Sequence, residues 1–146
     1  CSNNYGPYQN EEKFIPKIIN SILNRKKIPV YGNGQNIRDW IHVDDHCEAL
    51  LKILQKGKAG ETYNIGSNCE KKNLEVVYAI CDLLKVEPEL CIEFIEDRLG
   101  HDFRYAIDNT KIRKELKWKP KITFEKGIAK TVSHYKYKYD TEFEDL

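Results

Sequence analysis

Two arginines in loop-like surroundings are the residues best suited to binding chemistry in this 146-residue chain. Arg38 lies beside a predicted strand that begins at Trp40, and Arg98 follows another predicted strand in a glycine-containing loop, residues 97–101. A guanidinium offers a planar fork of N–H donors that matches a diphosphate, but a lone arginine is by default part of a surface ion pair. The residues alone therefore leave open an anion-binding site and a pair of ordinary surface arginines.

Amide side chains near the start of the chain, in Ser2-Asn3-Asn4-Tyr5-Gly6-Pro7, are a second candidate for binding. Asparagine both donates and accepts hydrogen bonds, which suits sugar hydroxyls and phosphate oxygens. The same composition is also typical of a polar loop that ends in a turn. The histidines show no metal-ligand spacing, and His101 taken by itself is expected to be structural or solvent-exposed.

Two motifs that hydride transfer on a dinucleotide would need are missing from this sequence. Gly32-Asn33-Gly34 supplies two glycines, but Ile37 occupies the third glycine position, and the segment follows a strand without opening a helix. No tyrosine is followed by a lysine four residues later, the spacing that places a phenol and an ammonium on one helical face. No catalytic residue is therefore predicted within the chain.

Composition excludes some classes of partner. Lysine and arginine number 24 against 23 acidic residues, a formal net charge of +1, which argues against a dominant electrostatic grip on nucleic acid or an anionic membrane. No apolar run approaches the ~20 residues of a membrane span.

The cysteines and the first residues of the chain indicate the cellular compartment and whether the chain is part of a longer protein. The five cysteines are odd in number and lack Cys-x-x-Cys spacing, which predicts reduced thiols in a cytoplasmic protein rather than a disulfide framework or zinc site. Cys47 and Cys81 are expected in helices as core residues. The chain contains no methionine and no signal peptide, so we expect a piece cut from a longer protein.

Hydrophobic periodicity and capping residues predict short strands mixed with helices. Helices are expected at residues 12–24, 44–55, 73–85, 108–116 and 123–135, and strands at 28–31, 40–43, 62–65, 92–95 and 105–107. The expected N-caps are Asp44 or Asp45, Asn73, Asp108 or Asn109, and Thr123. The strands are too few and too short for a complete doubly wound sheet, so the fold class is a small mixed α/β lobe that leans on another domain. Residues 136–146 lack a stable period and are predicted to be a frayed or disordered tail.

Several segments together resemble the C-terminal portion of the dTDP-glucose 4,6-dehydratases, a family of extended short-chain dehydrogenases/reductases. The likeness covers Ser2 to about Tyr135 and includes SNNYGPY, EKFIP, IPVYGNGQNIRDW, IHVDDHCEAL, GKAGETYNIGSNCEKKN, DRLGHDFRYAID and LKWKP followed by TFEKGI. The EKFIP and EKKN stretches are more particular to 4,6-dehydratases, whereas RDW and YNIG are shared with epimerases and decarboxylases of nucleotide sugars. The resemblance implies that residues 1–135 are a substrate-binding portion that lacks most of the Rossmann domain.

The resemblance also implies roles for matching positions. It assigns the diphosphate to Arg38 and Arg98, and a loop over the substrate to residues 97–101, in which Leu99 replaces the family's usual proline. That replacement loosens the backbone restraint on the loop. The complete implied substrate set is Asn3, Lys13, Phe14, Pro29, Val30, Tyr31, Arg38, Asn73, Asp97, Arg98 and His101, with residues 29–31 against the thymine and Asn4 touching the cofactor.

The implied reaction is an internal redox cycle that converts dTDP-glucose to dTDP-4-keto-6-deoxyglucose, a lyase reaction. NAD takes a hydride from C4, water leaves across C5 and C6, and the hydride returns to C6. In the family the NAD loop, the tyrosine–lysine pair and the acid–base carboxylates precede the first residue of this chain. The resemblance therefore implies a fragment that is inactive alone, a missing NAD-binding domain as its partner, and a homodimeric parent.

Other functions of the chain remain open on the sequence alone. The chain could be the substrate portion of a UDP-sugar epimerase or UDP-glucuronate decarboxylase, or a non-catalytic nucleotide-binding module. Because the lobe packs against an NAD domain in the family, we also expect exposed apolar surface, marginal stability or self-association.

Overall fold

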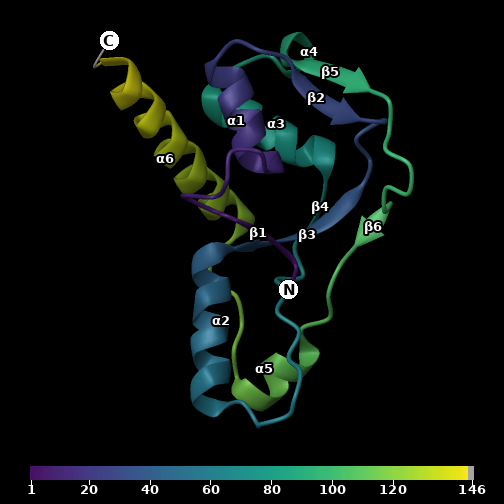
Figure 1. Cartoon of the computed structure of the whole chain (residues 1–146), viewed down its shortest axis with the longest axis vertical. Coiled ribbons are helices and arrows are strands. Elements are labelled where there is room, and N and C mark those ends of the chain that lie inside the picture. Colours follow the sequence, from purple (N-terminus) through teal and green to yellow (C-terminus); the bar gives the residue numbers. More distant parts are fainter. Residues whose placement is uncertain (145–146) are drawn as a thin grey trace.

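The molecule is a mixed α/β fold, as predicted, and its computed structural model describes residues 1–144, with side chains through residue 141. The strands are β1 (Asn3–Tyr5), β2 (Ile28–Tyr31), β3 (Ile37–His42), β4 (Glu70–Lys72), β5 (Ile92–Ile95) and β6 (Arg104–Tyr105). The helices are α1 (Phe14–Leu23), α2 (Val43–Lys56), α3 (Asn73–Leu84), α4 (Pro88–Cys91), α5 (Thr110–Leu116) and α6 (Phe124–Glu144). Figure 1 shows β1 and β3 crossing the middle, with α1 and α3 above them, α2 and α5 below, and α6 leading away.

Strand β3 is the shared member of the larger sheet. It pairs in parallel with β1, where Asn3 lies opposite Trp40, and antiparallel with β4, where Arg38 lies opposite Lys71. β6 pairs in parallel with the beginning of β3. β2 and β5 form a separate parallel pair. Short strands of this kind are stable because helices pack against them, and here α1, α3 and α6 do so.

The larger hydrophobic core lies between α1, α3 and α6. The periodic residues of α1, Ile15, Ile18, Ile19 and Ile22, are buried in it, as their spacing predicted. Phe124, Ile128, Val132 and Tyr135 of α6 are buried on the same core, again as predicted. Each such side chain contributes roughly 1.5–3 kcal/mol by leaving water. A smaller core around Trp118 lies between α2 and α5.

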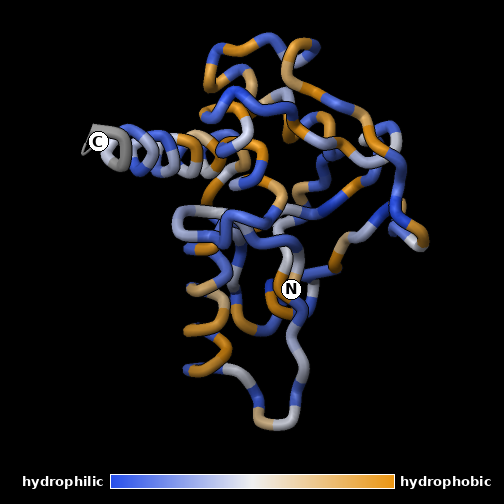
Figure 2. The backbone as a smooth tube through the Cα atoms, turned by 45° about the horizontal axis from the view of Figure 1, so that its top comes forward, coloured by the Kyte–Doolittle hydropathy of each residue, from blue (hydrophilic) through white to orange (hydrophobic). Residues whose placement is uncertain are grey.

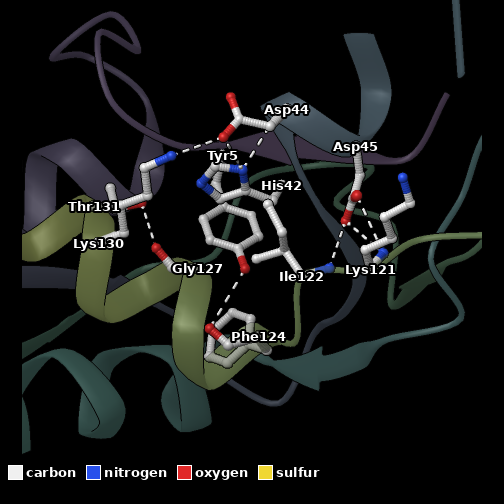
Figure 3. Close-up of polar contacts among 10 residues, drawn as sticks. All are labelled: Tyr5, His42, Asp44, Asp45, Lys121, Ile122, Phe124, Gly127, Lys130 and Thr131. Atoms are coloured by element: carbon white, nitrogen blue, oxygen red, sulfur yellow. Dashed lines mark hydrogen bonds and ion pairs between the residues drawn. The ribbon is translucent and has the colours of Figure 1, made fainter. Parts of the chain in front are cut away.

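A buried histidine, drawn in Figure 3, lies against Tyr5 of the larger core. The His42 side chain is fully buried against the Tyr5 ring, with centroids 5.4 Å apart. Its Nδ1 accepts a hydrogen bond from the Asp44 N–H at 3.2 Å and so caps α2. The predicted cap by Asp44 or Asp45 is therefore wrong, because the buried Asp45 carboxylate instead accepts hydrogen bonds from the Lys121 and Ile122 N–H groups.

Three further expectations fail for identifiable reasons. Residues 62–65 form a loop rather than a strand. A backbone hydrogen bond of 2.9 Å, from the Ser2 N–H to the Ile65 carbonyl, joins this loop to the residue that precedes β1. Lys72, not Asn73, is the N-cap of α3, and Glu75 accepts from the Lys72 N–H. Residues 136–144 continue α6 instead of forming a disordered tail, and a Lys138–Glu11 ion pair of 2.6 Å holds that helix against residues 8–11. The last two residues of the predicted tail lie outside the described residues.

One face of α2 carries apolar side chains that nothing in the described part of the chain covers. Leu50, Leu51 and Leu54 are 51%, 58% and 83% exposed. Cys47 is exposed as well, so its predicted core position is wrong, whereas Cys81 is buried as expected. The reason is that α2 turns Ala49, rather than the leucines, toward the smaller core. Figure 2 shows the apolar residues recurring along this helix at the lower left.

We expect this α2 face to drive self-association of the 146-residue chain. Leu54→Lys should raise the dimer dissociation constant by about 10-fold or more, because burying one leucine contributes roughly 1.5–3 kcal/mol. Sedimentation equilibrium measures this constant. Leu90→Lys in α4, where the leucine is 71% exposed, is the matched control. Equal effects of the two substitutions would rule out a specific role of α2.

His42 makes stability depend on pH. Burial lowers its pKa below the ordinary value of 6.5 and Lys130 lowers it further, against the opposing effects of Asp44 and Asp45. The unfolded chain therefore takes up the proton first, so the free energy of unfolding should fall as pH drops through about 6.5. His42→Asn keeps an acceptor for the cap and should reduce this slope in urea titrations between pH 7.5 and 5. A slope in His42→Asn equal to that of the unchanged chain would contradict the assignment.

Candidate functional site

A cavity of about 300 Å³ lies where β1, β2, β3, the beginning of α1 and the loop 97–101 meet. The structure brings together there all the residues of the predicted substrate set except Asp97. Its lining residues are Asn3, Glu12, Lys13, Phe14, Lys17, Pro29, Val30, Tyr31, Arg38, Trp40, Asn73, Arg98 and His101.

Strand pairing explains the floor of this cavity. Arg38 and Trp40 are two residues apart on β3 and therefore project from the same face of the strand. Asn3, on the neighbouring β1, lies directly opposite Trp40. The Phe14 ring from the first turn of α1 stacks on the Trp40 ring, with centroids 6.1 Å apart and planes inclined by 21°. The polar Asn3 and the two aromatic rings thus share one surface.

Cationic groups dominate the electrostatics of the cavity. Lys13, Lys17, Arg38 and Arg98 line it, against the single carboxylate of Glu12. None of these four cations forms an ion pair within the part of the chain that the structure describes. Lys13 is also the N-cap of α1, so the positive end of that helix adds to the field. The cavity is therefore suited to an anion.

The two arginines are held in place by other contacts. Arg38 donates from Nη1 to the Ile37 carbonyl at 2.7 Å and from Nη2 to the Asp102 carbonyl at 2.9 Å. A guanidinium has five N–H donors, so Arg38 keeps donors for a ligand. The Arg98 guanidinium lies over the Tyr31 ring, 5.1 Å from its centroid, a cation–π contact that orients it along the cavity wall.

Asp97 is the one member of the predicted substrate set that does not line the cavity. Its Oδ1 accepts hydrogen bonds from the Arg98 N–H at 2.8 Å and from His101 Nδ1 at 2.7 Å. The bond to His101 is the main reason that the pKa of Asp97 lies below its usual value. The carboxylate is therefore ionised and engaged within its own loop.

Asn4, the predicted cofactor contact, also lies apart from the cavity. Because side chains alternate along a strand, Asn4 projects from the face of β1 opposite to that of Asn3. Its Oδ1 is 2.6 Å from Nδ1 of His46, and its Nδ2 donates to the Ser2 carbonyl at 3.1 Å and to Cys1 Sγ at 3.4 Å. One lone pair of Oδ1 remains for a further partner, so Asn4 fits at most one hydrogen bond from a cofactor.

Three lining residues were not predicted: Glu12, Lys17 and Trp40. Lys17 lies one helical turn after Lys13, and Trp40 lies two positions after Arg38. Both could have been predicted, because residues four apart on a helix and two apart on a strand lie on the same face. No comparable signal identifies Glu12.

A buried carboxylate behind the cavity fixes the neighbouring loop. Asp39, between Arg38 and Trp40, is completely buried. It accepts hydrogen bonds from the Ser67 N–H at 3.2 Å, the Ser67 hydroxyl at 3.0 Å and the Cys69 N–H at 2.7 Å. These bonds hold residues 66–69 against β3, so Asp39 supports the cavity without reaching it.

The described residues include no group of three or more His, Cys, Asp or Glu side chains that could hold a metal ion. In the same part of the chain, no helix is both long enough and apolar enough to cross a membrane.

The family model described as GDP-mannose 4,6 dehydratase matches residues 1–131, and the chain belongs to this family. Among curated relatives, the dTDP-glucose 4,6-dehydratase of Salmonella typhimurium is 55% identical over 141 residues, which cover 92% of this chain and 39% of the relative. The crystal structure of dTDP-glucose 4,6-dehydratase from Bacillus anthracis, in complex with NAD, is similar over 96% of this chain and 44% of its own, with 51% identity and a TM-score of 0.90. UDP-glucose 4-epimerase of Thermotoga maritima, with UDP-glucose, matches at 25% identity and a TM-score of 0.88.

These similarities confirm the resemblance to the dTDP-glucose 4,6-dehydratases that the sequence motifs indicated. The chain spans about two fifths of the length of the curated relatives that it matches.

We expect Asp39→Ala to lower the free energy of unfolding by roughly 2–4 kcal/mol, since it leaves buried donors of residues 67 and 69 without a partner. Asp39→Asn should cost less because the amide retains one acceptor oxygen. Thermal unfolding followed by circular dichroism measures both variants. Asp82→Ala on the exposed side of α3 removes the same charge and should change stability by less than about 0.5 kcal/mol. An equal loss in Asp82→Ala would show that charge, rather than these hydrogen bonds, is responsible.

Proposed function

We propose that this chain is the nucleotide-sugar-binding portion of a dTDP-glucose 4,6-dehydratase, with its substrate-binding residues between positions 1 and 135. The observation that carries the proposal is the convergence of Arg38 and Arg98, from distant parts of the sequence, on one cavity lined by cations without ion pairs. The 55% identity to a dTDP-glucose 4,6-dehydratase supports the choice of sugar nucleotide over the epimerase alternative, whose structural relative is 25% identical.

In this proposal the diphosphate lies between the two arginines. A planar guanidinium can give two parallel hydrogen bonds to phosphate oxygens, and both arginines are already oriented by protein contacts. Lys13 and Lys17 extend the positive surface toward α1. Pre-oriented donors lose less entropy on binding, which favours affinity without any movement of the backbone.

The thymine and the sugar contact different residues of the cavity in the proposal. Pro29, Val30 and Tyr31 of β2 form an apolar edge for the base, and Phe14 adds an aromatic face. Asn3 offers an amide to the sugar hydroxyls, and Asn73, the first residue of α3, offers another to the nucleotide.

NAD is the proposed cofactor, held mainly by a domain that the longer relatives have beyond the matched region. Within this chain, Asn4 would contribute a single contact on its side of β1. The exposed face of α2 lies on the same half of the molecule as Asn4, since His46 of α2 contacts it. We propose that the NAD-binding domain covers this face, that the complete enzyme is a cytoplasmic homodimer, and that it converts dTDP-glucose to dTDP-4-keto-6-deoxyglucose.

The test is binding of thymidine diphosphate to the 146-residue chain by NMR and calorimetry. We expect signals of Arg38, Asn73 and Arg98 to shift, and Arg38→Ala to weaken binding by about 10- to 100-fold, since a charge-assisted hydrogen bond contributes roughly 1.5–3 kcal/mol. Arg113→Ala on the exposed side of α5 is the control and should leave binding unchanged.

Two outcomes would contradict the proposal. Tighter binding of uridine diphosphate than thymidine diphosphate would favour an epimerase or a UDP-glucuronate decarboxylase. No signal shift at millimolar thymidine diphosphate would exclude a preformed site. For a longer protein that contains this chain, the reaction itself is tested by loss of one water from dTDP-glucose in mass spectrometry.

A further inference from the structure

The loop 97–101 contains a tight turn whose two ends are joined by one carboxylate. The His101 N–H donates to the Arg98 carbonyl at 3.2 Å, and Gly100 has a φ of +71°. These are the features of a type II turn with Leu99 at its second position. Asp97 Oδ1 binds both the first N–H of this turn and the imidazole of its last residue.

The same carboxylate lies close to Gly32, at the turn that follows β2. Gly32 has a φ of +56°, and a Cβ placed on it would lie 3.0 Å from Oδ2 of Asp97. The Gly32 N–H donates to the Ile95 carbonyl at 2.9 Å, which ties the turn after β2 to the end of β5. A side chain at position 32 would crowd the Asp97 carboxylate and strain the backbone, so glycine permits the loop to pack this closely.

The loop in turn orients the groups that line the cavity. The side chains of Arg98 and His101 both lie against the Tyr31 ring, at 5.1 Å and 6.2 Å. The residue after His101 supplies the Asp102 carbonyl, which accepts hydrogen bonds from Nη2 of Arg38 and from the Asn36 amide. One loop therefore fixes both arginines.

We propose that Asp97 is a positioning residue that latches the two ends of the turn 98–101 together and thereby orients Arg98 and, through Asp102, Arg38, without contacting the ligand itself. This assigns Asp97 a different role from the direct substrate contact that the resemblance implied. The identity of the ligand rests on the proposed function, but the latch does not, since its contacts are all within the chain. Proline is favoured at the second position of a type II turn. With Leu99 there, the backbone is less restrained, and the carboxylate supplies the missing restraint.

The latch is tested first without any ligand, by amide hydrogen exchange in the full chain. Asp97→Ala should speed exchange at Arg98 and His101 by about 10-fold or more and reduce the Nδ1-protonated fraction of the neutral His101 ring, whereas Asp97→Asn, which retains an acceptor, should have a smaller effect. Exchange at Gln35 is the internal control, since its N–H donates to the Asn33 side chain within the turn that follows β2. Glu96→Ala removes a neighbouring exposed carboxylate and is the matched control variant. Unchanged exchange in Asp97→Ala would overturn the proposal.

Binding of thymidine diphosphate is the second measurement. Asp97→Ala should weaken it by about 10-fold, and adding Leu99→Pro to that variant should recover most of the loss, because proline restores the turn without restoring the carboxylate. A loss that Leu99→Pro fails to recover, with loop exchange unchanged, would identify Asp97 as a direct ligand contact. If the wild-type chain binds no thymidine diphosphate, the proposed function fails, and the exchange measurement alone decides the latch.

Discussion

Strand β3 is hydrogen-bonded to β1, β4 and β6, and this shared pairing determines where the functional side chains lie. Because side chains alternate along a strand, Arg38 and Trp40 project toward the cavity while Asp39 projects the other way. The buried Asp39 carboxylate then binds the N–H groups of residues 67 and 69 and keeps that loop beside the strand. A slip of one residue in the β1–β3 register would exchange these two faces and separate Asn3 from Trp40. The pairing of β3 is thus the condition for the cavity.

The charge of the cavity determines which kind of ligand this geometry favours. Lys13, Lys17, Arg38 and Arg98 repel one another across a space of about 300 Å³, and Glu12 is the one carboxylate among the lining residues. A bound anion relieves the repulsion among clustered cations, so it gains more here than it would from separate surface cations. A diphosphate carries the charge to do this, whereas a neutral sugar does not. If the ligand is the proposed nucleotide sugar, the electrostatics favour its diphosphate as the main source of affinity and leave the sugar hydroxyls to the amide side chains.

Sequence reasoning succeeded where the signal is local and failed where it depends on distant partners. The apolar periods of α1 and α6 reflect burial of one helical face, so both helices and their buried residues could be predicted. β1 could not, because three polar-leaning residues become a strand only through pairing with β3, a partner 37 positions away in register. The α2 leucines also follow a helical period, yet they are exposed, since a period shows that a face is apolar but not what covers it. Most cavity residues came from the family resemblance, and the position of Asp97 outside the cavity required the actual loop conformation.

The two halves of the molecule differ in how completely they are packed, and this difference agrees with the proposed function. The cavity belongs to the half with the larger core, where α1, α3 and α6 pack together, so its binding groups are positioned by contacts within the chain. The half with α2 and α5 has a smaller core, an exposed row of leucines and the Asn4–His46 contact. Groups that must act with a cofactor from another domain belong on a surface that the domain can cover, whereas groups that select a substrate gain from being rigid beforehand. Under the proposed function, substrate recognition would therefore lie where this chain packs its own binding groups, and hydride transfer at the surface that the proposed NAD-binding domain would cover.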